Sequence, residues 1–230
     1  MLSGCGSGDY SETYVIVLNG IEIGREVVIE KKGIKDSLIC LSEQVRDMPA
    51  SEKKGRNTVR TKIVFENGNS FPSSYSYKSD TGLSYDIKAE GDKIIKTLKG
   101  DTFTEPLEKG MLILDMTVFT TMDYWFRKYD TDKKGRQLFT TYLLPSGSVQ
   151  RLSIVPIRTG IHEKESRELE LKNYQIGIPD KLDMFLWVDK NKRLARLFIR
   201  GLNMDVIRSD LFKLINKNKE SEKQTDLIDR

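Results

Sequence analysis

The chain has 230 residues, of which 38% are hydrophobic and 31% charged, and its formal net charge is +4. These values fit one soluble globular domain, and because Lys and Arg are interspersed with acids we expect no nucleic-acid partner. One histidine and two cysteines exclude a zinc site with two or more His ligands, a four-cysteine site and a disulfide framework, and no cofactor is indicated.

The first residues resemble a bacterial lipobox. Leu2-Ser3-Gly4-Cys5 has the aliphatic, small, Gly and Cys pattern that lipoprotein signal peptidase cuts before the Cys, and Gly6-Ser7-Gly8-Asp9 is typical of a flexible polar tether. We therefore expect Cys5 to carry a lipid that anchors the protein to a membrane of the bacterial cell envelope, facing the periplasm or the exterior. No apolar run approaches the roughly 18 residues that cross a bilayer.

Only two residues, Met1 and Leu2, precede this box. A secretory signal needs a basic start and an apolar stretch of about 7–15 residues. Three explanations remain open: Met1 lies within the apolar part of a longer signal, the sequence has been trimmed, or the match is accidental and the protein is cytosolic.

From Tyr10 to about Asp101, short segments of alternating apolar residues are separated by turn signals. Asn19-Gly20 is the strongest of these signals, because both residues readily adopt the positive φ of a two-residue hairpin turn. Gly24 marks a bulge or a point of close backbone approach. This regular spacing predicts an antiparallel meander. Further turns are predicted at Glu30-Lys31-Lys32-Gly33, Asn67-Gly68-Asn69, Asp80-Thr81-Gly82, Glu90-Gly91-Asp92 and Lys99-Gly100-Asp101.

Cys40 alternates with Leu38 in one of these strands, which predicts a buried free thiol. Two alternatives remain: a disulfide with Cys5 if that residue is not lipidated, and a catalytic dyad with His162. Neither Cys40 nor His162 has a supporting motif for the dyad.

Residues 110–129 are predicted to form a helix. This segment has no Pro, its one Gly is Gly110, and Asp115 and Asp123 lie opposite the apolar side. We expect the apolar side to be buried against the concave face of a sheet. The apolar residues that recur at three- and four-residue steps are Met111, Leu114, Val118, Met122 and Trp125.

A second series of strands follows, and residues 209–230 form a polar tail that we expect to be frayed. The expected fold is mainly β (α+β), a curved antiparallel half-barrel sheet of about 11–13 strands wrapped around one central helix near 110–129. The expected organisation is a lipobox and tether over 1–9, a single β-rich domain over 10–208, and the tail. The later strands are predicted at 138–144, 149–158, 167–176, 184–188, 194–200 and 204–208.

Two hairpins carry a resemblance to a known group. Tyr14-x-Ile16-x-Leu18-Asn19-Gly20-x-x-Ile23-Gly24 near the start, and 182–189 with Arg193-Leu194-x-Arg196-Leu197 near the end, resemble an uncharacterised bacterial envelope lipoprotein family. That family is similar in architecture to the lipoprotein-carrier superfamily, half-open barrels whose concave face holds acyl chains beneath helices. Over residues 10–208 the resemblance implies a cell-envelope protein without established chemistry. The chain departs from the carriers in having one predicted helix where they have several lid helices.

Two candidate ion sites are better interpreted as structural. Asp130-x-Asp132-x-x-Gly135 resembles the start of an EF-hand calcium loop, but Lys134 occupies the fifth position and Thr141 the twelfth, where a bidentate Glu is required. We therefore predict a turn there. His162 lies in a polar stretch and is interpreted as a surface residue, although it could bind a metal together with a neighbouring glutamate.

One group of large apolar side chains has two interpretations. It fills the core, or it lines an apolar cleft between helix and sheet that accepts an acyl chain or another hydrophobic molecule. An open cavity above about 300 Å³ would favour binding, and ordinary packing would favour the core. The candidate cleft residues are Met122, Trp125, Phe126, Tyr142, Phe185, Trp187 and Phe198.

No phosphate-binding glycine loop and no Gly-x-Ser-x-Gly elbow occurs in the sequence. The sequence therefore predicts a non-enzymatic cell-envelope lipoprotein that binds a hydrophobic small molecule or lipid. One alternative is a carboxylate-based hydrolase of envelope polymers, which needs two cleft-facing carboxylates about 5–10 Å apart. The other is a scaffold that docks an envelope protein through a sheet edge.

Overall fold

The computed structural model describes residues 10–47, 55–66, 69–157, 168–177 and 184–228, with side chains as far as residue 218. These residues form one sheet of 15 strands. The helices are α1 (Thr120–Phe126), α3 (Ser209–Ile228) and the short 3₁₀ turns η1 (Ile34–Asp36) and η2 (Arg200–Leu202). The strands are β1 (Tyr10–Leu18), β2 (Ile21–Lys32), β3 (Leu38–Asp47), β4 (Arg56–Phe65), β5 (Ser74–Ser79), β6 (Ser84–Glu90), β7 (Lys93–Leu98), β8 (Asp101–Pro106), β9 (Leu112–Asp115), β10 (Gln137–Leu144), β11 (Ser148–Ile157), β12 (Lys172–Gly177), β13 (Met184–Val188), β14 (Leu194–Ile199) and β15 (Met204–Arg208).

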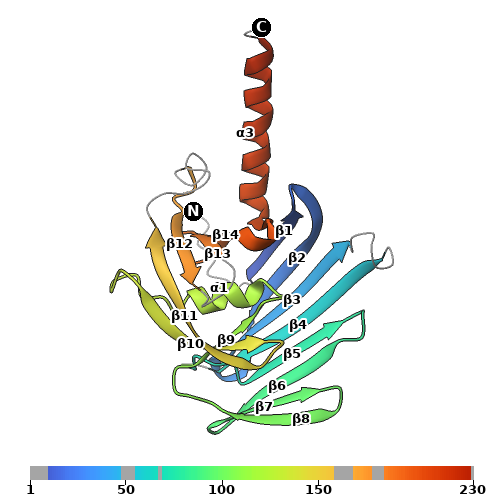
Figure 1. Ribbon diagram of the computed structural model, residues 1–230, viewed down its shortest axis with the longest axis vertical. Helices are drawn as coiled ribbons and strands as arrows, with labels where there is room; N and C mark the ends of the chain where they lie inside the picture. Colours follow the sequence, from blue (N-terminus) through green and yellow to red (C-terminus); the bar gives the residue numbers. More distant parts are fainter. Residues whose placement is uncertain (1–9, 48–54, 67–68, 158–167, 178–183, 229–230) are drawn as a thin grey trace, which may run out of the picture.

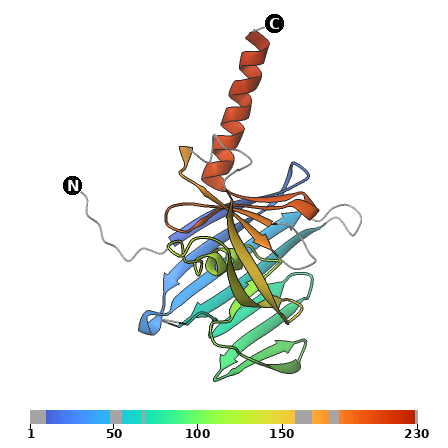
Figure 2. The same cartoon turned by 60° about the vertical axis from the view of Figure 1, so that its left-hand side comes forward.

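The chain builds this sheet outward from its middle and then returns. Strands β1 to β8 follow one another to one edge, and the chain then crosses to the other edge at β9 (Figure 1). After α1, strands β10 to β15 lead back to the middle, where β15 pairs with β1. Neighbouring strands are antiparallel except for β9 and β10, which are parallel. The sheet curves strongly, and α1 lies inside the curve (Figure 2).

Local signals in the first hairpin are confirmed. Asn19 and Gly20 both have positive φ, and they join β1 to β2 as a two-residue turn. Gly24 lies where the β1–β2 register shifts, and a Cβ there would be 2.0 Å from the carbonyl oxygen of Val45. Only a glycine allows β2 and β3 to approach this closely.

The helix predicted over 110–129 is wrong in extent. Residues 112–115 form strand β9, and α1 occupies only residues 120–126. The four residues of β9 are all buried, and a strand covered on both faces has a continuous apolar run that periodicity cannot distinguish from a buried helix. Strands β8 and β9 were not predicted, and with them the sheet has 15 strands, two more than the upper end of the expected 11–13.

The tail after residue 208 is helical, whereas the sequence predicts a frayed segment. Leu211 and Ile215 lie four residues apart on one face of α3 and are buried against Val15 and Ile207 on the outer face of the sheet. This apolar contact holds the first turns of α3, and the rest of the helix projects away from the sheet (Figures 1 and 2). None of the helices described is both long and apolar enough to cross a membrane.

Side chains join the two arms of the curved sheet, which no pairing between described strands closes into a barrel. Lys96 of β7 donates to the carbonyl oxygen of Pro145, which follows β10, at 2.5 Å. Deeper in the core, Asp115 of β9 accepts hydrogen bonds from the hydroxyls of Tyr75 (2.5 Å) and Tyr85 on β5 and β6. We call these three residues the Asp115 clasp. Burial raises the pKa of both tyrosines, so both hydroxyls keep the proton that they donate.

Candidate functional site

Two glutamates on the concave face of β2 position α1. Glu26 is fully buried, and its carboxylate accepts hydrogen bonds from the backbone amides of Phe119 (3.0 Å) and Thr120 (3.1 Å). Gln44 on β3 donates to the same carboxylate at 3.0 Å. These bonds satisfy amide groups at the start of α1, which would otherwise be buried without an acceptor. The first turn of α1 is therefore fixed to the sheet through Glu26.

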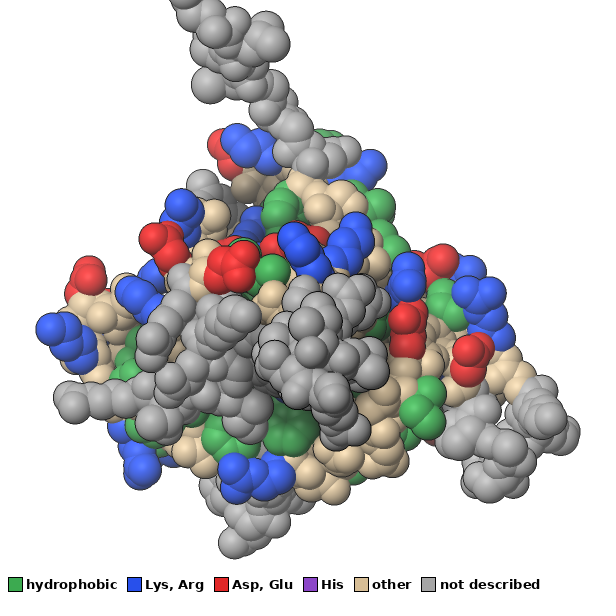
Figure 3. Space-filling view, turned by 90° about the horizontal axis from the view of Figure 1, so that it is seen from above, with side chains coloured by type: hydrophobic (Ala, Val, Ile, Leu, Met, Phe, Trp, Pro, Cys, Tyr) green, Lys and Arg blue, Asp and Glu red, His purple; other side chains and the backbone are tan. Residues whose placement is uncertain are grey.

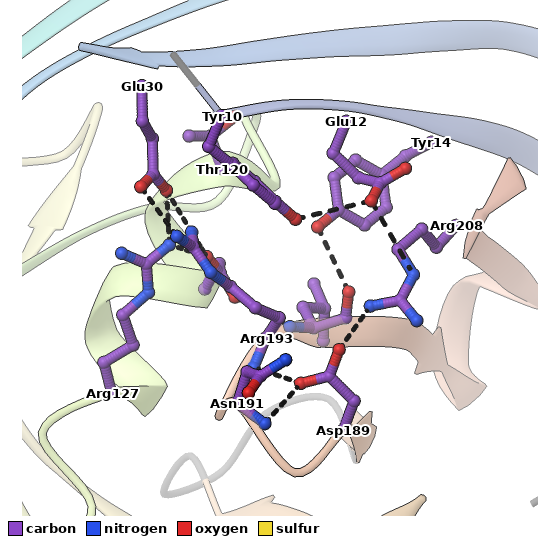
Figure 4. A network of polar contacts seen from close by, with 12 residues as sticks. Tyr10, Glu12, Tyr14, Glu30, Thr120, Arg127, Asp189, Asn191, Arg193 and Arg208 are labelled. Atoms are coloured by element: carbon purple, nitrogen blue, oxygen red, sulfur yellow. Dashed lines mark hydrogen bonds and ion pairs between the residues drawn. The ribbon is translucent and has the colours of Figure 1, made fainter. Parts of the chain in front are cut away.

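Glu30 is the centre of a second set of contacts, shown in Figure 4. Arg193 binds both oxygens of Glu30, with Nη2 at 2.8 Å from Oε2, and Arg127, which directly follows α1, donates to Oε1 at 2.5 Å. Asp123 pairs with Arg127 and accepts the backbone amide of Leu194 at 2.7 Å. We call Glu30, Asp123, Arg127 and Arg193 the Glu30 network. Its two carboxylates balance its two guanidinium groups, so it joins β2, α1 and β14 without a net buried charge.

A cavity of about 410 Å³, the rim cavity, lies beside this network. Arg208 donates to Asp189 at 2.7 Å and to Asp210 at 2.9 Å, and each of the five charged side chains in the lining has an ion-pair partner. Burial raises the pKa of the Asp210 carboxyl, but Arg208 outweighs this effect and the net shift is downward. A hydrolase acid needs a raised pKa, so the Asp210 carboxyl fits an ion pair better than a catalytic acid. The lining residues are Tyr10, Glu12, Asp189, Asn191, Arg193, Arg208 and Asp210.

The molecular surface seen from above carries mixed charge. Figure 3 shows Lys and Arg side chains lying beside Asp and Glu side chains across this face, with hydrophobic side chains between them. Within the described part of the chain, no three His, Cys, Asp or Glu side chains are grouped as a metal ion would require.

A smaller cavity of about 240 Å³, the α1 pocket, lies between α1 and the ends of β3 and β4. One wall is apolar, because Leu38 lies beside the rings of Phe65 and Tyr124, whose centroids are 5.1 Å apart. Arg127 and Lys128 are the basic residues of the same lining, and Asp36 and Glu66 are its acidic residues. The pocket therefore combines an apolar surface with an edge of mixed charge, on which Lys128 is exposed. Its full lining is Asp36, Leu38, Phe65, Glu66, Asn69, Tyr124, Arg127 and Lys128.

Two buried polar atoms of residues that line the α1 pocket make no hydrogen bond among the described residues. They are the hydroxyl of Tyr124 and Nε of Arg127. Burial raises the pKa of Tyr124, and it raises the pKa of the neighbouring Cys40 thiol to about 12, so both groups are neutral. Both atoms are buried within the protein, and a buried donor without an acceptor carries an energetic cost.

The structure divides the predicted cleft residues between two faces of the sheet. Met122, Trp125, Phe126 and Tyr142 are buried together in the core, where Trp125 donates to Thr141 at 3.0 Å. Phe185, Trp187 and Phe198 lie on the opposite face of β13 and β14, where Arg196 stacks on Trp187. None of these seven side chains lines a cavity described above.

Three further predictions have different outcomes. The buried free thiol of Cys40 is confirmed. The turn at Asp130 is also confirmed, since its carboxylate accepts the backbone amide of Asp132 at 3.0 Å, two residues on. Cys5 and His162 lie outside the described residues.

Sequence reasoning missed the buried carboxylates of Glu26, Glu30, Asp115 and Asp123. In β2 the alternation of Val27 and Ile29 is the more obvious pattern, yet Val27 is 39% exposed and the residues facing the core are Glu26, Val28 and Glu30. Acids at alternate positions of an otherwise apolar strand were the one available signal. Their partners are too distant in sequence to be identified from it.

Comparisons with known proteins bear on the fold. No family model matches the sequence, and no curated protein matches it. The structure is similar to a β-barrel-like protein of the domain of unknown function DUF1849 from Brucella abortus, with a TM-score of 0.56 and 12% identity over 86% of this chain and 93% of that one. A DUF1089 family protein from Pseudomonas aeruginosa gives a TM-score of 0.30 and 13% identity over 85% and 93% of the two chains. The first likeness supports a barrel-like fold of the kind found in an uncharacterised family.

Proposed function

We propose that the protein is a non-enzymatic lipoprotein of the bacterial cell envelope that binds a small amphiphile in the α1 pocket. The observation that carries this proposal is an apolar wall beside the exposed cation of Lys128 in one cavity between sheet and helix. The apolar part of the ligand packs against Phe65 and Leu38, and an anionic head group pairs with Lys128.

The size of the pocket limits the ligand. Its volume of about 240 Å³ is below the roughly 300–1,000 Å³ of sites that enclose drug-sized molecules. The pocket therefore suits a short acyl chain or the end of a longer one, with the remainder outside. We infer that the ligand lies beside Tyr124, whereas the set around Trp125 belongs to the core.

Ligand binding is tested by titrating octanoate into the purified protein by calorimetry. Leu38→Trp fills the pocket and is expected to abolish the heat of binding. Leu138→Trp is the matched control, because Leu138 is an exposed leucine on β10 that does not line the pocket. Equal octanoate binding by the two variants would contradict the proposal.

The role of Lys128 is tested with a second variant. Lys128→Gln is expected to weaken octanoate binding about tenfold and to leave the binding of neutral octanol unchanged, because only the ion pair is lost. An equal loss for the acid and the alcohol would show that Lys128 does not recognise a charged head.

The anchor is part of the same proposal and is tested separately. Mass spectrometry of the protein from cell membranes is expected to show a diacylglycerol thioether at Cys5 as the first residue, and Cys5→Ser is expected to release the protein from the membrane fraction. An unmodified Cys5 with Met1 retained would exclude the anchor.

An exposed sheet edge supports a second candidate function, docking of an envelope protein by strand addition. Strand β8 is the last strand on its side of the sheet, and Phe103 in its centre is 49% exposed. A photo-crosslinking residue at position 103 is expected to capture one partner in cells, and the same residue at exposed position 138 is not. Identical patterns at both positions would exclude β8 as a docking edge.

A further inference from the structure

The turn that joins β2 to β3 carries the most exposed large hydrophobic side chain of the described residues. Ile34 is 87% exposed, although hydrophobic residues of this size are usually buried. Lys31, Lys32 and Lys35 are exposed on the same turn, against one exposed acid, Asp36. We call residues 31–37 the hairpin tip. It combines one apolar side chain with an excess of positive charge.

The hairpin tip has a defined shape. The amide of Gly33 donates to the carbonyl of Ser37 at 2.7 Å, and the amide of Ser37 donates to the carbonyl of Ile34 at 3.2 Å. A Cβ on Gly33 would lie 2.4 Å from Oγ of Ser37, so the turn closes tightly around this glycine. Ile34 is therefore held at the surface by an ordered turn.

The hairpin tip lies at the end of the sheet where β1 begins. Tyr10 pairs with Glu30, and the hairpin tip begins at the next residue of the chain, Lys31. Four residues separate Cys5 from Tyr10, so a lipid on Cys5 would lie within about 18 Å of the start of β1. An anchored chain thus has this end of the sheet next to the membrane.

The α1 pocket opens at the same end. Asp36 belongs to both the hairpin tip and the pocket lining, and Leu38 follows directly as the first residue of β3. Lys128, across the pocket from them, adds a further positive charge. An exposed aliphatic residue among lysines matches a membrane interface, where the side chain enters the acyl boundary and the lysines meet anionic head groups.

We propose that the hairpin tip is a membrane-contact element, in which Ile34 inserts into an anionic lipid surface and Lys32 and Lys35 pair with its head groups. Contact of this kind brings the mouth of the α1 pocket to the bilayer. The membrane is then the source of the amphiphile, a step that rests on the function proposed above. The contact itself requires no ligand in the pocket.

Flotation with lipid vesicles tests the contact directly. The full chain carrying Cys5→Ser, which cannot be anchored, is mixed with vesicles of phosphatidylcholine alone or of phosphatidylcholine with phosphatidylglycerol. We expect binding to the mixed vesicles only. Ile34→Ser is expected to reduce it about tenfold, and Lys32→Gln with Lys35→Gln at least as strongly, because each lysine near an anionic surface contributes about fivefold.

Ile21→Ser is the matched control, because Ile21 is a 68% exposed isoleucine at the opposite end of the same strand. Its vesicle binding is expected to equal that of the parent protein. Equal losses for Ile21→Ser and Ile34→Ser, or no binding to anionic vesicles at all, would overturn the proposal. Undiminished vesicle binding by both Ile21→Ser and Ile34→Ser would also overturn it.

Octanoate titration of the same variants separates this proposal from the proposed function. Ile34→Ser is expected to bind octanoate normally and vesicles poorly, whereas Leu38→Trp is expected to bind vesicles normally and octanoate not at all. A parent protein that binds vesicles through Ile34 but never binds octanoate would support the membrane contact and contradict the proposed function of the α1 pocket. A parent protein that binds octanoate but not vesicles would contradict the membrane contact and support the function of the pocket.

Discussion

Glu30 and Arg193 lie 163 residues apart in the chain and meet through both carboxylate oxygens, with Nη2 of Arg193 at 2.8 Å from Oε2 of Glu30. The guanidinium of Arg193 also stacks over the ring of Tyr10 at 3.9 Å. Arg127 binds the same carboxylate. One side chain of β2 therefore fixes both the end of α1 and the start of β14. The order of the site therefore depends on this carboxylate.

Glu30→Ala is expected to lower the free energy of unfolding by about 3 kcal/mol, because it leaves the guanidinium groups of Arg193 and Arg127 partly buried beside a single acid. Urea denaturation monitored by Trp fluorescence measures the change. Glu22→Ala, at the exposed Glu22–Arg25 pair on the same strand, is expected to cost less than about 1 kcal/mol. Equal losses for the two variants would show that the Glu30 network contributes no more than a surface pair.

Glu26→Ala is expected to destabilise α1 locally as well as the whole protein, by about 3 kcal/mol, because the amides of Phe119 and Thr120 lose their acceptor in a buried position. Hydrogen exchange of these two amides is expected to become faster than that of the β2 amides. Glu43→Ala on the neighbouring strand removes an exposed partner of Arg60 and is the control. Unchanged protection of residues 119 and 120 would contradict the role of Glu26.

Tyr75→Phe and Tyr85→Phe are each expected to cost about 2 kcal/mol, since each hydroxyl donates to the Asp115 carboxylate. The double variant is expected to cost more than the sum by about 1 kcal/mol, because one oxygen of Asp115 then has no donor. Tyr129→Phe, whose hydroxyl donates to the neutral carbonyl of Gly135, is expected to cost only about 1 kcal/mol. If the losses of the two single variants add in the double variant with no excess, the two tyrosines are not coupled through Asp115 as the clasp requires.

The stability of the protein is expected to fall between about pH 8.5 and 10 partly through Cys40. Burial raises the pKa of this thiol to about 12, whereas an unfolded thiol has a pKa of about 8.5. Above pH 8.5 the unfolded chain loses a proton that the folded chain keeps, so stability present at lower pH is lost as pH rises, by about 2 kcal/mol at pH 10.

Cys40→Val removes this titration and serves as the comparison. Urea unfolding under reducing conditions across this pH range is expected to show a smaller decrease in stability for the variant than for the parent. Parallel pH profiles for the two proteins would mean that the folded thiol titrates like an unfolded one.

Elements with strong local signals could be predicted from the sequence. Asn19-Gly20 fixes a turn by backbone preference alone, and Met184–Val188 alternates so regularly that its boundaries agree with the structure. The helix predicted over 110–129 was wrong in extent because Met111 to Leu114 is apolar on both faces. Such a run fits a buried strand as well as a helix. The α3 helix was missed because two buried residues, Leu211 and Ile215, hold a mostly polar segment.

The candidate site could not be predicted for a different reason. Its contacts join residues that nothing in the local pattern relates, such as Glu26 with Thr120, 94 positions apart. A glutamate in a strand is usually solvent-exposed, and only the long-range fold determines that this one meets the start of a helix. The α1 pocket likewise requires β3, β4 and α1 to be in place before its lining exists.

Because β1 pairs with β15, the sheet cannot be completed until the last strand of the chain has been synthesised. The chain leaves the ribosome with its N-terminus first, so β1 can pair with β2 early. The other edge of β1 stays unpaired until residues 204–208 have been synthesised. Such late, distant pairing slows folding, and an open strand edge is a template for aggregation. We therefore expect nascent chains that end before residue 204 to aggregate, and the newly made protein to depend on chaperones that shield β1 until its last strand arrives.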